Sequence, residues 1–521
     1  MNVTEVKNKG LQTTIISNKW VKESMELLDK QLGKGWRQKY IVWDCTADQK
    51  EIPEQDKFKR LYRSATKSDN PDIFDFDFLN DGATELMARC PELHMAMSDD
   101  EPIVFLFDVP KERATLVDSG TKTKESMKSF SWGMSSRALY AQYFYRIYIY
   151  KRAFKFSDAH IGAFAPATYL SSSSFKKFRE KFFQEFHYET GFVFDAACLD
   201  SQKEAWALSF VHFSASKPTL SHRYPMLLKE QQNDIVVTTG STSIYNLDQE
   251  VSASMWVRVG LRDRERNSLP EFSSAMTVRY TRKKGYVGQV GTVNFDSNSV
   301  ANNHKEVMLA SSTTTRSSNV PIMDFNWQRV IPLFAARRCV DRNWENWQQE
   351  YRIPDTDHPI WPQYVADSLV YSIFDVKSRQ TSLGNVLYND RNYDIRNEFF
   401  WINPSQVLKM FVNRGFDDFY KDYLHSDVPY FQKMLDVAPI SEQAEELLHS
   451  ATQLFEKSVD SRIEMHANRP EWQLHRWDAG YAQLKRVWMR HHFDDYTRFR
   501  AQFEEFRQNM KERTYVLGFL G

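Results

Sequence analysis

Three aspartates stand at or beside the ends of predicted strands, where a carboxylate can meet a ligand. Asp44 follows an apolar run over residues 40–43, Asp77 lies in the alternating run 75–79, and Asp108 follows the clearest strand, 103–107. An ionised carboxylate only accepts hydrogen bonds, so it can bind the hydroxyl or amine donors of a ligand. The same position also suits an aspartate that completes a turn or caps a strand end, and the sequence leaves both interpretations open.

A serine-rich turn followed by basic residues is the second candidate site. Ser174 is the predicted N-cap of a helix over residues 175–186, and Lys176, Lys177 and Arg179 follow it. A helix N-terminus with lysines nearby can bind a phosphate, so these four residues are the candidates for contact with nucleic acid. The alternative is a capped amphipathic helix with a solvated basic face.

The sequence predicts no metal site. The four cysteines are far apart and form no CxxC pair, which also argues against a disulfide framework. His491 and His492 are adjacent, with Asp494 and Asp495 close behind. Adjacent residues point to different faces of a helix, so this group is expected to be a surface cluster.

Strands alternate with helices over the first part of the chain and predict an α/β fold with a largely parallel sheet. Residues 19–32 show helical spacing and end before Gly33, which suits a C-terminal cap. Further helices are predicted over 136–150 and 175–186. The predicted strands cover residues 40–43, 61–64, 75–79, 103–107, 160–164, 191–194 and 205–213.

The character of the sequence changes twice further along. Residues 214–320 contain short β-prone runs and polar turns, and helical spacing dominates residues 321–521. We therefore expect a domain over 1–213, a β-rich region over 214–320 and a mainly helical region over 321–521. Apolar stripes at 447–455 and 496–510 predict packing faces rather than a cofactor site.

Composition limits the choice of partners. Lysines plus arginines and aspartates plus glutamates both number 68, which argues against a strongly steered nucleic-acid binder but leaves room for a local basic groove. Aromatic residues make up 14% of the chain and indicate large mixed cores and a partner surface. The chain has no apolar signal segment and no run of membrane-spanning length, so a reducing cytoplasm is expected.

Several strings resemble the large amino-methyltransferases that modify adenine in DNA, in the order in which that family has them. They are WDCTADQK from Trp43, FDFDFLND from Phe74, VFLFDVPK from Val104, LYAQYFYRIYIYK from Leu139, HIGAFAPATYLSSSSFKKFREKF from His160, FAARRCVDRNW from Phe334, DSLVYSIFDVKSRQTSL from Asp367, NEFFW from Asn397 and WDAGYAQLK from Trp477. The resemblance implies a Rossmann-like methyltransferase sheet with an added target-recognition region, and S-adenosylmethionine as the cofactor.

The residues that would bind this cofactor depart from the family pattern. The resemblance places the glycines of the cofactor turn at Asp48 and Lys50, where bulky charged side chains should block or reshape the pocket. It places the acid that grips the ribose hydroxyls at Lys67, which donates hydrogen bonds but accepts none. Asp69 is the alternative position for that acid. Asp44 and Asp77 keep the acids of the first and third motifs.

The loop that would hold the target adenine also departs from the pattern. It contains Asp108, Val109, Pro110 and Lys111, where the family has an Asp or Asn, two prolines and an aromatic residue. Asp108 can still accept a hydrogen bond from the adenine amine, but Lys111 offers no ring against which a flipped base could stack.

The resemblance and these departures together predict a catalytically inactive, methyltransferase-like protein of a bacterium or phage. We expect no cofactor, and a retained role in weak binding of double-stranded DNA or in contact with a protein partner. An active S-adenosylmethionine-dependent adenine methyltransferase is the first alternative, supported by Asp44, Asp77 and Asp108. A phage structural or assembly protein that self-associates without nucleic acid, in the virion or the host cytoplasm, is the second.

Overall fold

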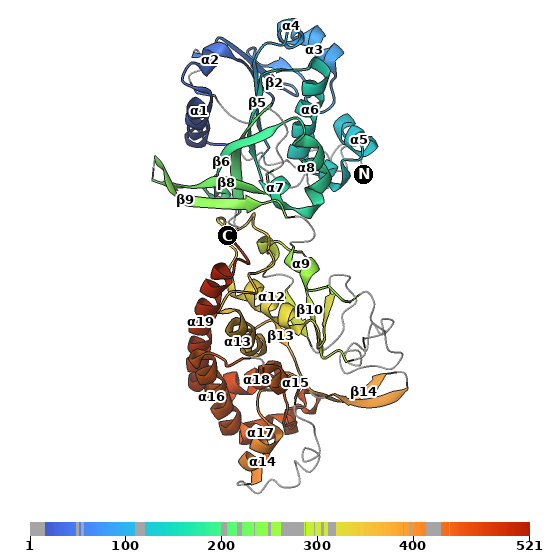
Figure 1. Ribbon diagram of the computed structural model, residues 1–521, viewed down its shortest axis with the longest axis vertical. Coiled ribbons are helices and arrows are strands. Elements are labelled where there is room, and N and C mark those ends of the chain that lie inside the picture. The colour runs from blue at the N-terminus through green and yellow to red at the C-terminus, as the bar shows by residue number, and fades with distance from the viewer. Residues whose placement is uncertain are drawn as a thin grey trace. The chain divides into compact units, whose positions relative to one another are not determined.

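The computed structural model forms two compact units along the chain (Figure 1). The first contains Met1–Leu247 and Asn343–Glu350, and the second contains Asp248–Arg342 and Tyr351–Gly521. The structure describes residues 16–47, 52–53, 57–109, 120–199, 206–215, 221–233, 235–247, 252–261, 286, 288–295, 297–303, 307–310, 319–388, 390–395, 397–412, 429–436 and 438–521.

A nine-stranded sheet organises the first unit, in the order β3-β2-β1-β4-β5-β7-β6-β8-β9. Its strands are β1 Ile41–Asp44, β2 Arg60–Ala65, β3 Phe74–Asp75, β4 Ile103–Asp108, β5 Ala159–Ala165, β6 His187–Asp195, β7 Ala207–Ser214, β8 Arg223–Gln232 and β9 Ile235–Tyr245. The strands from β1 to β5 pair in parallel, and β7 is antiparallel to both of its neighbours. The mixed α/β sheet is consistent with a methyltransferase-like fold.

Helices cover both faces of this sheet. They are α1 Asn18–Leu32, α2 Trp36–Lys39, α3 Ala83–Arg89, α4 Pro91–Ser98, α5 Lys122–Ser129, α6 Leu139–Phe154, α7 Thr168–Ser171 and α8 Lys176–Phe182. Side chains alternate along the strands, so that Val104 and Leu106 share a core with α1, while Phe105 and Phe107 share another with α6 and α8. A sheet buried on both faces accounts for the continuous apolar run of β4.

Most elements predicted from the sequence of the first unit are confirmed, with two differences. The strand predicted over 75–79 ends at Asp75, because the carboxylate of Asp77 accepts the backbone N–H groups of Leu79 and Asn80 and forms a turn. The helix predicted over 175–186 is confined to α8 and follows a 3-10 turn over Ser173–Phe175. Ser174 is therefore not the N-cap of α8, and the prediction that it is one was wrong.

A smaller antiparallel-rich sheet and a group of helices build the second unit. The four-stranded sheet has the order β12-β10-β11-β13, and β14 pairs with β15 alone. The elements are α9 Ala253–Trp256, β10 Gly291–Asn294, β11 Met308–Ala310, β12 Asn319–Ile322, α12 Trp327–Cys339, α13 Trp361–Phe374, β13 Ser378–Arg379, β14 Leu383–Tyr388, β15 Arg391–Ile395, α14 Pro404–Val412, α15 Tyr430–Leu435, α16 Glu442–Lys457, α17 Val459–Asn468, α18 Tyr481–His491 and α19 Phe493–Val516. The apolar stripes of α16 and α19 lie in its core, as predicted.

The β-rich stretch over residues 214–320 is divided between the two units. β8 pairs in parallel with β6 and carries β9 with it, so the first sheet continues past residue 213 to Tyr245. β10, β11 and β12 belong to the second unit. In the described part of the chain, no helix combines the length and apolar character needed to span a membrane.

Candidate functional site

The strand order of the first unit reverses between β1 and β4. From β1 the chain runs outward to β2 and β3, and it then returns to place β4 on the other side of β1. In open α/β sheets, ligands bind outside the carboxyl ends of the strands at such a switch point. Asp44 ends β1 and Asp108 ends β4, so the fold brings two of the three predicted aspartates to this position.

Asp44 is fully buried and lies beside Arg63 at the end of β2. Arg63 Nε is 3.7 Å from Asp44 Oδ2, and the two side chains are 8% and 0% exposed. The guanidinium of Arg63 also donates to the carbonyl of Ala47 at 3.1 Å, and the backbone N–H of Thr46 donates to Asp44 Oδ1 at 3.4 Å. The carboxylate at the switch point is therefore matched by a cation of the protein itself.

Asp108 continues the hydrogen bonding of the sheet beyond the end of β4. Its backbone N–H donates to the Thr46 hydroxyl at 2.8 Å, and the N–H of Val109 donates to the carbonyl of Phe164 in β5 at 2.9 Å. Both side chains are buried. Two hydrogen bonds therefore hold the start of the loop after β4, one to Thr46 just beyond β1 and one to β5.

The remaining residues of the predicted cofactor and target loops are placed in different ways. Lys67 is exposed and has a positive φ of 70°, so it occupies a turn beyond β2. Asp77 serves the turn described above, in agreement with its structural interpretation. Asp48, Lys50, Pro110 and Lys111 lie outside the described residues.

The predicted basic helix is largely engaged by the protein itself. Arg179 is 2% exposed and donates to the carbonyls of Tyr169 and Ser172 at 3.0 and 2.8 Å. Arg179 is therefore not solvated, as the basic-face interpretation expected, because its guanidinium donates hydrogen bonds to carbonyls of the preceding turn. Lys176 lies 3.9 Å from Glu180 one helical turn away, and Lys177 is exposed.

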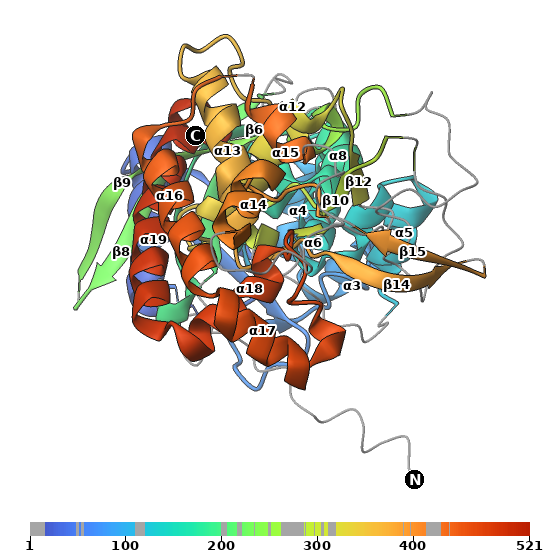
Figure 2. The same cartoon turned by 90° about the horizontal axis from the view of Figure 1, so that it is seen from below.

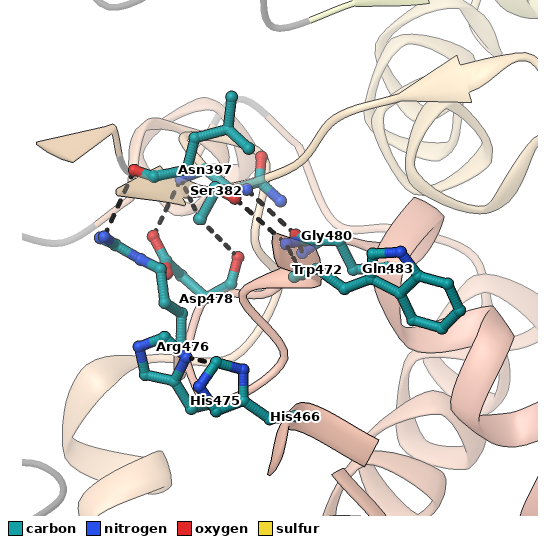
Figure 3. Close-up of polar contacts among 10 residues, drawn as sticks. Ser382, Asn397, His466, Trp472, His475, Arg476, Asp478, Gly480 and Gln483 are labelled. Carbon is teal, nitrogen blue, oxygen red and sulfur yellow. Dashed lines mark hydrogen bonds and ion pairs between the residues drawn. The ribbon is translucent and has the colours of Figure 1, made fainter. Parts of the chain in front are cut away.

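A polar cluster in the second unit is centred on Asp478, a residue that the sequence did not single out (Figure 3). Asp478 is fully buried, and its Oδ2 accepts the backbone N–H of Asn397 at 2.9 Å. Its carbonyl accepts the Ser382 hydroxyl at 2.9 Å, and Arg476 Nε lies 3.4 Å from Oδ1. Burial raises the pKa of the Asp478 carboxyl, and Arg476 opposes that effect. The string WDAGYAQLK was the only sequence signal for this cluster.

Gly480 and Gln483 complete the Asp478 cluster. Gln483 Oε1 accepts the backbone N–H groups of Ser382 and Gly480 at 3.1 and 2.9 Å. A Cβ on Gly480 would lie 1.9 Å from the carbonyl oxygen of Gln380, so only glycine permits this approach. The cluster therefore fastens residues near 380 and 397 to the segment that leads into α18.

Two histidines adjoin the cluster. The Nδ1 atoms of His466 and His475 are 3.3 Å apart. Burial, with His466 and Arg476 nearby, lowers the pKa of His475 to about 4. Among the described residues, no group of three or more His, Cys, Asp or Glu side chains could hold a metal ion.

A basic surface lies close to the same cluster and consists of Arg379, Lys485, Arg486 and Arg500. Arg379 and Arg486 are exposed, and the other two side chains are half-buried. Burial and the positive charges of Arg486, Arg500 and Arg379 lower the pKa of Lys485. Asp375 acts in the opposite direction, but its Oδ1 already lies 3.0 Å from Arg338 Nε. We name these four residues the basic surface.

Comparisons with known proteins give distant structural likenesses alone. No family model and no curated protein matches the chain. A DNA-bound ATP-dependent Type ISP restriction-modification enzyme, LlaBIII, is 11% identical over 43% of this chain, with a TM-score of 0.30. A DrdV–DNA complex is 12% identical over 54%, with a TM-score of 0.31. A modification subunit of a putative type I restriction enzyme from Vibrio vulnificus YJ016 is 12% identical over 44%, with a TM-score of 0.27.

These likenesses are too distant to assign an activity. The matched regions cover 20%, 35% and 51% of the three neighbours, so this chain spans about half of their length or less. What the chain shares with these three proteins is a low-identity structural resemblance.

Proposed function

We infer that this chain is a methyltransferase-like protein that binds duplex DNA without using S-adenosylmethionine. The observation that carries the proposal is the buried pair of Asp44 and Arg63 at the switch point. A cofactor that drew Asp44 away from Arg63 would leave a buried cation without this carboxylate. Breaking a buried ion pair in this way costs about 3–5 kcal/mol, which opposes binding.

The backbone beyond β4 gives a second reason. The family pattern requires a proline where this chain has Val109, and a proline has no N–H. Here the Val109 N–H donates to Phe164. The loop is therefore built on a sheet hydrogen bond that the family sequence could not make, which supports the view that its target-holding geometry is lost.

The basic surface supports the DNA-binding part of the proposal. It concentrates four cationic side chains in a chain whose total charge is zero. Protein cations that neutralise DNA phosphates release counterions from the duplex. We therefore expect an affinity that depends only in part on the DNA sequence and falls steeply as the salt concentration rises. The predicted helix around Lys176 and Lys177 contributes less, because Arg179 is buried.

An active adenine methyltransferase is the second candidate. Asp44 and Asp108 end neighbouring parallel strands, the position at which a cofactor and its target would meet. This arrangement keeps the alternative open to a direct test.

Calorimetric titration of the whole chain with S-adenosylmethionine separates the two candidates. We expect no heat of binding, and micromolar binding that is altered by Asp44→Asn would overturn the proposal in favour of the enzyme. Fluorescence anisotropy with a labelled mixed-sequence duplex tests the other half. We expect binding at low salt, with a salt slope that falls by about one for each cation removed by Lys485→Gln or Arg486→Gln. The matched control is Lys128→Gln, an exposed lysine of the first unit that pairs with Glu125.

A further inference from the structure

The strand β9 forms one outer edge of the nine-stranded sheet. In the described part of the chain it pairs only with β8, and both views show the two strands extending to the left beyond the other strands of the first unit (Figures 1 and 2). The pairing of β6 with β8 covers only Leu227 and Leu228, so the outer half of the hairpin is a two-stranded ribbon. Such a ribbon is marginally stable in water, and it gains stability when a further strand pairs with it.

The helix α1 holds this ribbon in place. Lys229 of β8 forms an ion pair with Glu23 of α1, and Lys19 Nζ lies 3.5 Å from the carbonyl oxygen of Asn233 at the tip. Val236 packs against the apolar core that contains α1. The tip of the hairpin therefore has a defined position, which a strand needs if a partner is to pair with its backbone.

The backbone of β9 presents hydrogen-bonding groups along the outer edge. Gln232 and Ile235 close the hairpin across two residues, and Asn233 has the positive φ, 55°, of a type I′ turn. The closing pair of such a hairpin is hydrogen-bonded and the pairs then alternate, so Val236 and Thr238 direct their N–H and C=O groups away from β8. Among the described residues, the backbone of 235–241 forms hydrogen bonds with β8 alone.

The chemistry of this edge favours an identical strand as the partner. Residues 235–241 are IVVTTGS, a largely β-prone segment with no charged residue and no proline, the two features that usually protect an edge strand. Ile235 is 64% exposed, and residues 238–241 are exposed as well. Without charge, the segment has nothing to match with an acidic or basic partner, whereas two copies of it meet without like-charge repulsion.

Two features of the sheet limit the association to a pair. Thr239 is an extra residue opposite β8, and a bulge of this kind increases the twist of the hairpin. Two copies related by a two-fold axis have the same twist, whereas a twisted edge resists the stacking of many flat strands. The opposite edge of the sheet, β3, is only two residues long and offers little for further pairing. A two-fold contact is closed, so we expect a dimer rather than a fibre.

We propose that two copies of this chain associate by antiparallel pairing of residues 235–241 of β9 about a two-fold axis near Thr238, which joins their sheets. A segment of this length spans about 24 Å. The contact is at the small end of specific interfaces, so we expect a dissociation constant of about 1–100 μM. The association involves the first unit alone and does not depend on DNA binding.

Sedimentation velocity of the whole protein, at concentrations on both sides of this range, tests the proposal. We expect the mass of the parent to rise from that of one chain to that of two. Thr238→Lys and Thr238→Glu each place like charges on both sides of the axis and should weaken the association about tenfold or more. An equimolar mixture of the two variants brings opposite charges together and should associate within about threefold of the parent. Gln232→Lys is the matched control, because it adds the same charge to β8 of the same hairpin and should leave the association unchanged.

The mixture distinguishes pairing across an axis from damage to the hairpin, since two misfolded variants would not restore each other. A parent that stays a single chain at the highest concentration would overturn the inference, because the edge would then have a different partner. The same holds for a mixture that stays monomeric, or for Thr238→Lys that associates as the parent does. Duplex binding at low salt is a separate measurement, and its failure would overturn the proposed function while leaving this inference standing.

Discussion

The carboxylate of Asp478 accepts the backbone N–H of Asn397 at 2.9 Å, although 81 residues separate the two in the chain. Asp478 is fully buried and also faces Arg476, so its loss removes the counterion of a partly buried cation. It also removes one of the two acceptors of the Asn397 N–H, the other being the Ser382 hydroxyl at 2.8 Å. We expect Asp478→Ala to lower the free energy of unfolding by about 3–5 kcal/mol, as urea denaturation can measure. Glu471→Ala is the control, because Glu471 and its partner Arg469 are both exposed. Equal effects of the two substitutions would contradict the assigned role of Asp478.

Substitution of Gly480 tests the steric fit of the same cluster, whereas substitution of Asp478 tests its charge. Any Cβ at this position would lie 1.9 Å from the carbonyl oxygen of Gln380, and backbone on both sides must shift to admit it. We expect Gly480→Ala to cost about 1–3 kcal/mol or more through overpacking. Gly35→Ala is the control, since Gly35 has a negative φ and no atom within 4 Å of its Cβ position. An unchanged melting temperature in Gly480→Ala would contradict the close contact between Gly480 and the Gln380 backbone.

A pair of histidines makes the stability of the first unit depend on pH. His160 Nδ1 is 3.1 Å from His212 Nε2, and burial lowers the pKa of His212 to about 3. Because the folded pKa lies below that of an unfolded histidine, the unfolded state binds the extra proton first as the pH falls. Stability should therefore decrease between about pH 6.5 and pH 3, with a slope of up to about 1.4 kcal/mol per pH unit for this group.

The measurement for this prediction is urea denaturation at a series of pH values. His212→Asn should be less stable than the parent at neutral pH but should show a shallower loss of stability towards acid. His449→Ala, on the exposed face of α16, should keep the slope of the parent. A slope that is unchanged in His212→Asn would assign the effect to other groups.

The sequence predicted the elements of the first unit well because their signals are local. The apolar runs of β1 and β4 and the spacing of α1 follow from which side chains must be buried. The strand predicted over 75–79 is shorter because the Asp77 side chain accepts backbone N–H groups of the following residues. The alternation of polar and apolar residues does not reveal such a side-chain hydrogen bond.

The candidate site was harder to predict, because its partners come from distant parts of the chain. Asp44 and Asp108 were identified, but the pairing of Asp44 with Arg63 depends on the parallel register of β1 and β2. The burial of Arg179 depends on carbonyls of the preceding turn. The Asp478 cluster joins residues near 380, 397 and 480, and no spacing rule connects such segments.

The Asp44–Arg63 pair should show strong coupling in a double-mutant cycle. Asp44→Asn and Arg63→Gln each leave one buried partner without its counterion, whereas the double variant leaves no unmatched charge. We expect each single change to cost about 3–5 kcal/mol, and the double variant to cost clearly less than their sum. The exposed pair of Glu125 and Lys128 should show no measurable coupling in the same experiment. Additive effects at Asp44 and Arg63 would remove the observation on which the proposed loss of cofactor binding rests.

Restoring the family pattern in the target loop alone should not restore methylation. In Val109→Pro with Lys111→Tyr, the loop regains the first of its two prolines and its aromatic residue, but the new proline removes the N–H that donates to Phe164 at 2.9 Å. The strand end would lose a buried hydrogen bond and leave a carbonyl without its donor, at a cost of about 1–3 kcal/mol. Asp44 would still be paired with Arg63, and Asp48, Lys50 and Lys67 would still stand where the family has two glycines and an acid. We therefore expect no methylated adenine in plasmid DNA from cells that express the double variant, as nucleoside mass spectrometry can measure.

Adding Asp48→Gly, Lys50→Gly and Lys67→Glu should return weak cofactor binding at most, because Arg63 is still paired with the Asp44 carboxylate at the switch point. Methylated adenine in the double variant alone would show that the cofactor site is intact, and the inference would then fail at the Asp44–Arg63 pair rather than at the target loop.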